Sequence, residues 1–220
     1  PWHPLLACAL FIVPGVPLIN FVDDMLDNYI QVGIVRAVNT LLMVAAMAFG
    51  IAFAVKLCHI ENFFPTISMV PHHQYWEYAI AAAISAMGFS MIFNIQRRLL
   101  WVVAIGGIIA VCTRNFVNLG PSTDNIGLDM GLVIGSFSGA VLVSLIAIKA
   151  VHWFHVPNHV LTIPSVIPMI PGVLMYRMLF GIININVQSI DQVTPLMKAI
   201  ESGVNSGLVI MCIALGVAIP

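Results

Sequence analysis

Charged side chains are scarce in this sequence of 220 residues, where Asp, Glu, Lys and Arg together make up 8%, against roughly 25% in an ordinary soluble domain. So few charges cannot cover the surface of a protein dissolved in water, which excludes the class of water-soluble domains. The sequence also has no run of Lys or Arg and a net charge of −1, which excludes a basic surface for nucleic acid. The lipid bilayer is therefore the expected surroundings of the chain.

Patterns for catalysis and metal binding are missing as well. The four cysteines include no Cys-x-x-Cys pair, so we expect free thiols that act as small apolar residues. His152, His155 and His159 have helical spacing, but no carboxylate or cysteine completes a metal site. No nucleophile with a neighbouring base and no phosphate-binding loop indicates an enzyme. We therefore expect no enzymatic activity, no metal and no other cofactor.

Hydrophobic runs fill most of the chain, which is 60% hydrophobic with a mean hydropathy of +1.03. A membrane-spanning helix needs about 20 apolar residues. The sequence therefore predicts an all-α polytopic membrane protein with about seven transmembrane segments, at 4–20, 33–57, 75–96, 99–117, 126–150, 157–183 and 196–219.

A Pro-Gly segment occurs twice. "VPGVPLIN" at 13–20 corresponds to "IPGVLMYR" at 170–177, and residues 38–54 share Val, Asn, Ala and Gly positions with residues 204–220. Five crossings separate the two units, so we expect them to point in opposite directions as an inverted-topology repeat. Three spans precede the second unit and none precedes the first, which indicates that the chain is a fragment. The alternative is that apolar sequence resembles itself by chance.

Both Pro-Gly segments are expected to be broken helices. Pro164, Pro168 and Pro171 each remove a backbone donor within one apolar segment. In hydrocarbon such a break is tolerated only inside protein or beside a watery cavity, so freed carbonyls and Ser165 could line a polar path. Paired broken helices are typical of the substrate site of a transporter. The alternative is a pair of ordinary kinks that bind nothing.

Three aspartates follow the first break. Asn20, Asp24 and Asp27 have the spacing of one helix face, whereas Asp23 points elsewhere. Carboxylates at membrane depth are costly and mark ion, proton or substrate paths, and neighbouring carboxylates repel one another. Asp24 and Asp27 are therefore candidates for proton coupling. The alternative is an acidic loop at the membrane surface.

Arginines lie in or beside the apolar segments. Arg177 lies six residues after Pro171 and needs a partner, for which Asp24, Asp129, Glu201 or a substrate carboxylate is available. Arg36 and Arg114 are further candidates, and snorkelling to the membrane surface is the alternative for each. A stripe of glycines is expected to let a second helix pack closely, at Gly127, Gly131, Gly135 and Gly139.

The sequence resembles the threonine/serine exporter family, including its two-subunit bacterial form. The segments that carry this resemblance are "PGVPLINFVDD", "MGFSMIFNIQRRLL", "GGIIAVCTRN" and "IPSVIPMIPGVLMYR". The resemblance implies that 1–58 is the end of a first exporter half, 59–74 a linker and 75–220 a second half. It also implies a ten-span protein that exports small hydroxy amino acids using the proton gradient, with a link to succinate export in the two-subunit relatives.

We therefore expect a multi-pass exporter in the bacterial inner membrane, with threonine or serine as cargo and succinate as the alternative. Arg177 would hold the cargo carboxylate, Asp24 would carry the proton or bind the amine, and a dicarboxylate would need a second cation from Arg114 or Arg36. A missing N-terminal half or a partner subunit would complete it, and a homo-oligomer stays open. A non-transporting scaffold is the alternative of another class, and a channel is disfavoured. The full set of expected site residues is Pro14, Gly15, Asn20, Asp24, Arg36, Arg114, Ser165, Pro171, Gly172 and Arg177.

Overall fold

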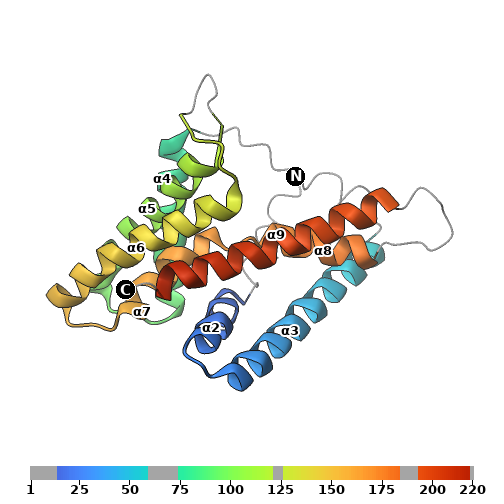
Figure 1. The fold of residues 1–220 in the computed structure, drawn as a ribbon, viewed down its shortest axis with the longest axis horizontal. Coiled ribbons are helices and arrows are strands. Elements are labelled where there is room, and N and C mark those ends of the chain that lie inside the picture. Colours follow the sequence, from blue (N-terminus) through green and yellow to red (C-terminus); the bar gives the residue numbers. More distant parts are fainter. Residues whose placement is uncertain (1–13, 59–73, 121–125, 184–192, 219–220) are drawn as a thin grey trace.

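A computed structural model describes residues 14–58, 74–120, 126–183 and 193–218. Over these residues the secondary structure is helical, without strands (Figure 1). The first expected span, 4–20, and the linker 59–74 lie mostly outside the described residues. The helices are α2 (Gly15–Leu26), α3 (Ile30–Leu57), α4 (Tyr75–Ile92), η1 (Arg97–Leu99), α5 (Leu100–Asn118), α6 (Leu132–Phe154), α7 (Asn158–Val166), η2 (Ile167–Met169), α8 (Gly172–Ile183) and α9 (Val193–Ala218).

Part of the predicted set of seven spans is found. Within the described residues, 4 helices are long and apolar enough to cross a membrane, and the bent pair Asn158–Met169 and Gly172–Leu179 makes up to 5. The helix α4 is not among them, although it covers most of the expected span 75–96, because polar and aromatic residues occupy its first turn. The four helices are those at Ile30–Ala54, Arg97–Asn118, Leu132–Phe154 and Leu196–Ala218.

Small residues set the packing of α4, α5 and α6. An added Cβ at Gly107 of α5 would lie 2.7 Å from Ala86 Cβ of α4, and one at Gly135 of α6 would lie 2.6 Å from the carbonyl oxygen of Arg114. At Gly139 an added Cβ would lie 2.6 Å from the carbonyl oxygen of Ala110. Backbone atoms can approach so closely only where no side chain intervenes. These glycines therefore allow α4, α5 and α6 to pack closely against one another.

The predicted glycine stripe is shorter than expected. Gly127 and Gly131 precede α6 and belong to a non-helical segment, in which Gly131 has a φ of 90°. This segment satisfies carbonyl groups at the end of α5, because Leu128 N–H donates to Phe116 O and Met130 N–H donates to Val117 O. Leu128 and Met130 of this segment thus cap α5, and the packing stripe begins only at Gly135.

Each Pro-Gly segment starts the same arrangement of elements. A 12-residue helix begins at the glycine, Gly15 for α2 and Gly172 for α8. A long helix then packs against the short one, α3 against α2 and α9 against α8. The two units therefore share the order of their elements and the length of the short helix, and their long helices have 28 and 26 residues. Their opposite orientation in the membrane stays a prediction.

The core joins the two units to α5 and α6. The long helix α9 crosses the middle of the molecule and contacts α6, α8 and α2 (Figure 1). One buried cluster contains residues from nearly every element, among them Leu18, Ile19, Val44, Ala110, Ala140, Val166, Met169, Val209 and Ile213. The first half of α2 is thus part of the core, which fixes the position of Gly15 at the start of this helix.

The helix α3 is covered less than its counterpart α9. In the best 18-residue window of each span, 22% of the α3 residues are buried, against 39% for α9. The repeat expected from the sequence would pair Gly50 of α3 with Gly216 of α9. An added Cβ at Gly216 would lie 2.6 Å from Ala140 Cβ of α6, whereas one at Gly50 would meet nothing within 4 Å. Within the described residues, no element covers α3 at Gly50 as α6 covers α9.

Candidate functional site

The start of α2 at the first Pro-Gly segment lies against the break at the second. Gly15, the first residue of α2, is buried. An added Cβ there would lie 2.7 Å from Ile170 Cδ1 and 3.7 Å from Ile167 Cγ1. Ile170 directly precedes Pro171, so residues from two segments more than 150 positions apart in the sequence meet at this point. The structure thus places Gly15 beside the residue that precedes Pro171 and Gly172.

Prolines shape the second break. Pro164 lies inside α7, Pro168 lies in η2, and Pro171 precedes α8. The backbone becomes extended at Ile170, with a ψ of 129°, and the two helical parts are bent by 53°. Proline has no N–H and cannot continue the hydrogen-bond ladder of a helix, so carbonyl groups here are free to accept other donors. One of them, at Met169, is used by a side chain.

Arg114 of α5 reaches this break. Its Nη1 donates to the carbonyl oxygen of Met169 at 3.4 Å, and its Nε and Nη2 donate to Asn115 Oδ1 at 3.3 Å each. Arg114 is partly buried and Asn115 is 5% exposed. No carboxylate among the described residues forms an ion pair with Arg114. A cation without a countercharge therefore lies directly beside the broken helix.

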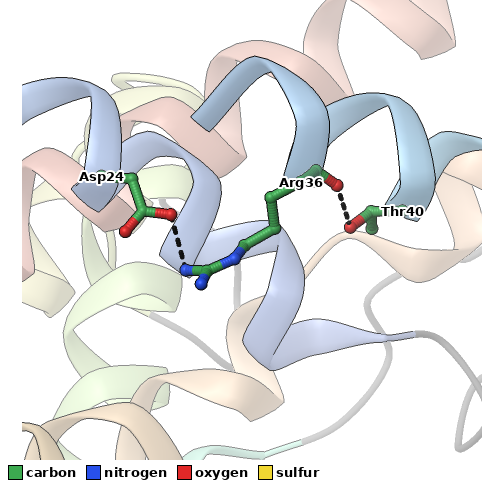
Figure 2. A network of polar contacts seen from close by, with 3 residues as sticks. All are labelled: Asp24, Arg36 and Thr40. Atoms are coloured by element: carbon green, nitrogen blue, oxygen red, sulfur yellow. Dashed lines mark hydrogen bonds and ion pairs between the residues drawn. The ribbon is translucent and has the colours of Figure 1, made fainter. Parts of the chain in front are cut away.

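Asp24 and Arg36 form an ion pair between α2 and α3, with 2.6 Å between Asp24 Oδ2 and Arg36 Nη1 (Figure 2). Thr40 Oγ1 donates to the carbonyl oxygen of Arg36 at 2.7 Å. Asp24 lies nine residues after Gly15, which is about 13 Å along the helix axis. The pair thus joins the outer part of α2 to α3 and lies away from the break.

Asp23 and Asp27 mark the outer end of α2, beyond the span expected at 4–20. Burial raises the pKa of Asp23, the charge of His159 opposes this, and Asp27 and Asp24 add to the increase. Asp27 is exposed at the C-terminal cap of α2. The neighbouring carboxylates expected from the sequence thus influence one another, with burial as the larger cause.

Three other expected residues lie elsewhere. Ser165 is buried, donates to Leu161 O at 2.7 Å and lies 3.2 Å from Val103 O, so its hydroxyl holds α7 to α5. Asn20 is half-buried on α2, and Arg177 is half-buried on α8. Within the described residues Arg177 forms no ion pair with the expected carboxylates, and Asp24 is already paired with Arg36.

A pocket of about 530 Å³ extends from the break toward the start of α7. Ligand pockets usually measure about 300–1,000 Å³. Val16 and Pro164 line it near the breaks, and Asn94, Gln96 and His159 line it farther away. The remaining lining residues are mainly apolar: Phe93, Ile95, Leu99, Val156, Pro157, Val160 and Ile163.

The sequence analysis gave no role to Asn115 or to the Met169 carbonyl. One feature of the sequence could have indicated a role for Asn115, because it is a polar residue directly after an arginine in a mostly apolar helix. No pattern in the sequence distinguishes the Met169 carbonyl from other carbonyls freed by prolines. Only the packing of α5 against η2 identifies it.

Comparison with known proteins covers nearly all of the sequence. No solved structure matches this chain. Residues 3–58 match the family model described as "Putative threonine/serine exporter", and residues 78–220 match the one described as "Threonine/Serine exporter, ThrE". The second match alone covers more than half of the chain, and the apolar helices agree with a multi-pass membrane protein. The chain belongs to the threonine/serine exporter family, a family of transporters.

Proposed function

We propose that this chain works as a proton-coupled secondary transporter that exports threonine and serine across the bacterial inner membrane. The observation that carries the proposal is the contact between the two breaks, where Gly15 packs against Ile170. Broken helices that meet inside a bundle are the usual location of a transporter substrate site. Membership in the exporter family supports the direction and the class of cargo.

The ends of the short helices suit the carboxylate of a small cargo. Both α2 and α8 begin at this junction, and a helix N-terminus carries a partial positive charge. The pocket lined by Val16 and Pro164 gives a path between the junction and the outer end of α7. In this proposal the cargo enters between the breaks, and the two units then rock to open the opposite side.

An amino acid fits the charges better than succinate. A dicarboxylate needs two cations near the junction, and Arg36, one of the two expected second cations, is paired with Asp24 at 2.6 Å. Arg114 lies at the break without a carboxylate partner among the described residues. The charge of Arg114 balances one carboxylate, as in threonine and serine.

One observation favours a second candidate, a membrane scaffold that transports nothing. Leu18, Ile19, Val166 and Met169 belong to one buried cluster around the two breaks, so apolar side chains fill the space there. A transporter must displace this cluster to admit cargo, whereas a scaffold would keep it in place.

An efflux assay separates these functions. Proteoliposomes loaded with labelled threonine, serine or succinate should release the two amino acids faster than protein-free liposomes, and an imposed pH gradient should accelerate the release. Faster release of succinate than of threonine would favour the dicarboxylate exporter. Correctly folded protein that releases none of the three would favour the scaffold.

We expect Asp24→Asn to make threonine efflux insensitive to the pH gradient. The proposed cycle protonates Asp24, which breaks the pair with Arg36 and frees α2 from α3, and an amide cannot take up this proton. Efflux driven by the gradient should fall by about a hundredfold, the lower end of the usual range for removal of a proton-transfer group. Asp27→Asn, at the exposed end of the same helix, is the comparison that tests whether this second candidate shares the role. Unchanged gradient-driven efflux in folded Asp24→Asn would exclude the proton-carrier role.

A partner helix on α3 completes the proposed transporter. Gln31, Arg36 and Asn39 line a pocket of about 460 Å³ on α3, and exposed polar groups are costly against lipid. In the second unit, α6 covers the matching face of α9 at Gly216. The proposed partner is an equivalent helix with a stripe of small residues, from an N-terminal half or from a separate subunit, and a second copy of this chain is the alternative.

Gly50→Leu should weaken the association with this partner and leave the stability of the chain unchanged. Its added side chain meets nothing within 4 Å in the described residues, but it would separate an incoming helix from α3. Native mass spectrometry or crosslinking in membranes measures the association. Gly88→Leu, also without a neighbour within 4 Å, is the matched control. Undiminished association in Gly50→Leu would place the partner on another face.

A further inference from the structure

The Arg114 guanidinium keeps unused donors at the α7–α8 break. A guanidinium has five N–H groups. Asn115 Oδ1 accepts from Nε and Nη2, and the Met169 carbonyl oxygen accepts from Nη1. Two N–H groups, one on each terminal nitrogen, are not used by these three bonds, and the Tyr78 side chain on α4 interacts electrostatically with the guanidinium. No carboxylate of the described residues balances the positive charge, so an anion would find both charge and paired donors here.

Asn115 adds a second set of unused donors. Its side chain is 5% exposed, and its Nδ2 atom is buried without a hydrogen-bond partner. The orientation of the amide is determined by Arg114, because the reverse orientation would turn the NH₂ group toward the guanidinium. Buried polar groups nearly always have partners. This NH₂ group therefore points to a ligand that accepts hydrogen bonds.

We infer that Arg114 and Asn115 together form the subsite that binds the carboxylate of the cargo. Every unpaired group in this pair is a donor and one of them is charged, so the matching ligand is a small carboxylate. The Met169 carbonyl holds the guanidinium at the break. This assigns to Arg114 the role that the sequence suggested for Arg177, and it rests on the proposed function because it names the contact that the exported amino acid makes.

Binding measurements on the purified protein test this subsite. Wild-type protein should bind L-threonine, and L-threonine methyl ester, which lacks the carboxylate, should bind at least about tenfold more weakly. Asn115→Asp is the decisive variant, because its carboxylate would neutralise Arg114 within the protein without a change in size. We expect it to keep or raise the melting temperature and to weaken threonine binding by about tenfold.

Further variants make the result unambiguous. Arg114→Gln should also weaken threonine binding, whereas Arg98→Gln, at an exposed position of η1, should leave it unchanged. The subsite would be overturned if folded Asn115→Asp kept its affinity for threonine, or if the methyl ester bound as tightly as threonine. Efflux by the wild type would still support the exporter in that case. Absence of threonine binding and of efflux in the wild type would overturn both.

Discussion

Replacing Gly15 by leucine is expected to reduce threonine efflux by about tenfold or more, because overpacking of a filled site costs about 1–3 kcal/mol. Even a single added Cβ would lie 2.7 Å from Ile170 Cδ1. The remaining leucine atoms would separate the two breaks and displace the start of α2. The initial rate of labelled threonine release from proteoliposomes measures the effect.

Three further variants interpret this result. Gly15→Ala should have a small effect, because the atom that it meets is the mobile end of the Ile170 side chain. Ile170→Ala in the Gly15→Leu background should restore part of the efflux, since it removes that atom. Gly88→Leu controls for bulk at a glycine with no neighbour within 4 Å. Normal efflux in folded Gly15→Leu would show that the junction of the breaks does not take part in transport.

The sequence predicted the breaks better than the contacts around them. Proline lacks an N–H wherever it occurs, so Pro164, Pro168 and Pro171 identify an interrupted helix without knowledge of the fold. The break expected at Pro14 stays a prediction, because the residues before it lie outside the described part of the chain. The contact between Gly15 and Ile170 needs the arrangement of both units, and only the similarity between the two segments suggested it. The effect of a proline on its own helix could thus be predicted from the sequence. The contact between distant segments could be suggested only by the similarity of their sequences.

The ion pair of Asp24 shows what the sequence left undetermined. Both Asp24 and Arg36 were named as candidates, but Asp24 was considered as a partner for Arg177. The pair depends on the turn between α2 and α3, where Asn28 has a positive φ of 66°. This turn directs α3 back along α2 and brings Arg36 to Asp24. Spacing along one helix could not predict a pair that forms across two.

The sequence analysis also did not predict the surroundings of two polar side chains, Ser165 and Asn115. Ser165 was expected to line a polar path, yet it donates to Leu161 O four residues earlier, a frequent bond of serine in helices. Asn115 received no role, although it is the buried neighbour of Arg114. Both cases concern where a polar side chain points, and this depends on which helices pack against it.

Gly139→Leu is expected to have the largest effect on the fold. An added Cβ would lie 2.6 Å from the carbonyl oxygen of Ala110 and 3.0 Å from Met169 Sδ. The carbonyl belongs to the backbone of α5 and cannot rotate away, so α5 and α6 must separate. Overpacking of this kind costs about 1–3 kcal/mol, which corresponds to roughly 2–12 °C in the melting temperature of a chain of this size.

Thermal unfolding of the purified protein in detergent measures this effect, and Gly207→Leu is the matched control. Gly207 lies on the exposed face of α9 with nothing within 4 Å of an added Cβ, so a leucine there should shift the melting temperature little. Because Met169 also touches Gly139 and accepts a hydrogen bond from Arg114, any Gly139→Leu protein that still folds should also lose threonine affinity. An unchanged melting temperature in Gly139→Leu would mean that α5 and α6 are not in the close contact described, and the position of Arg114 at the break would then lose its support.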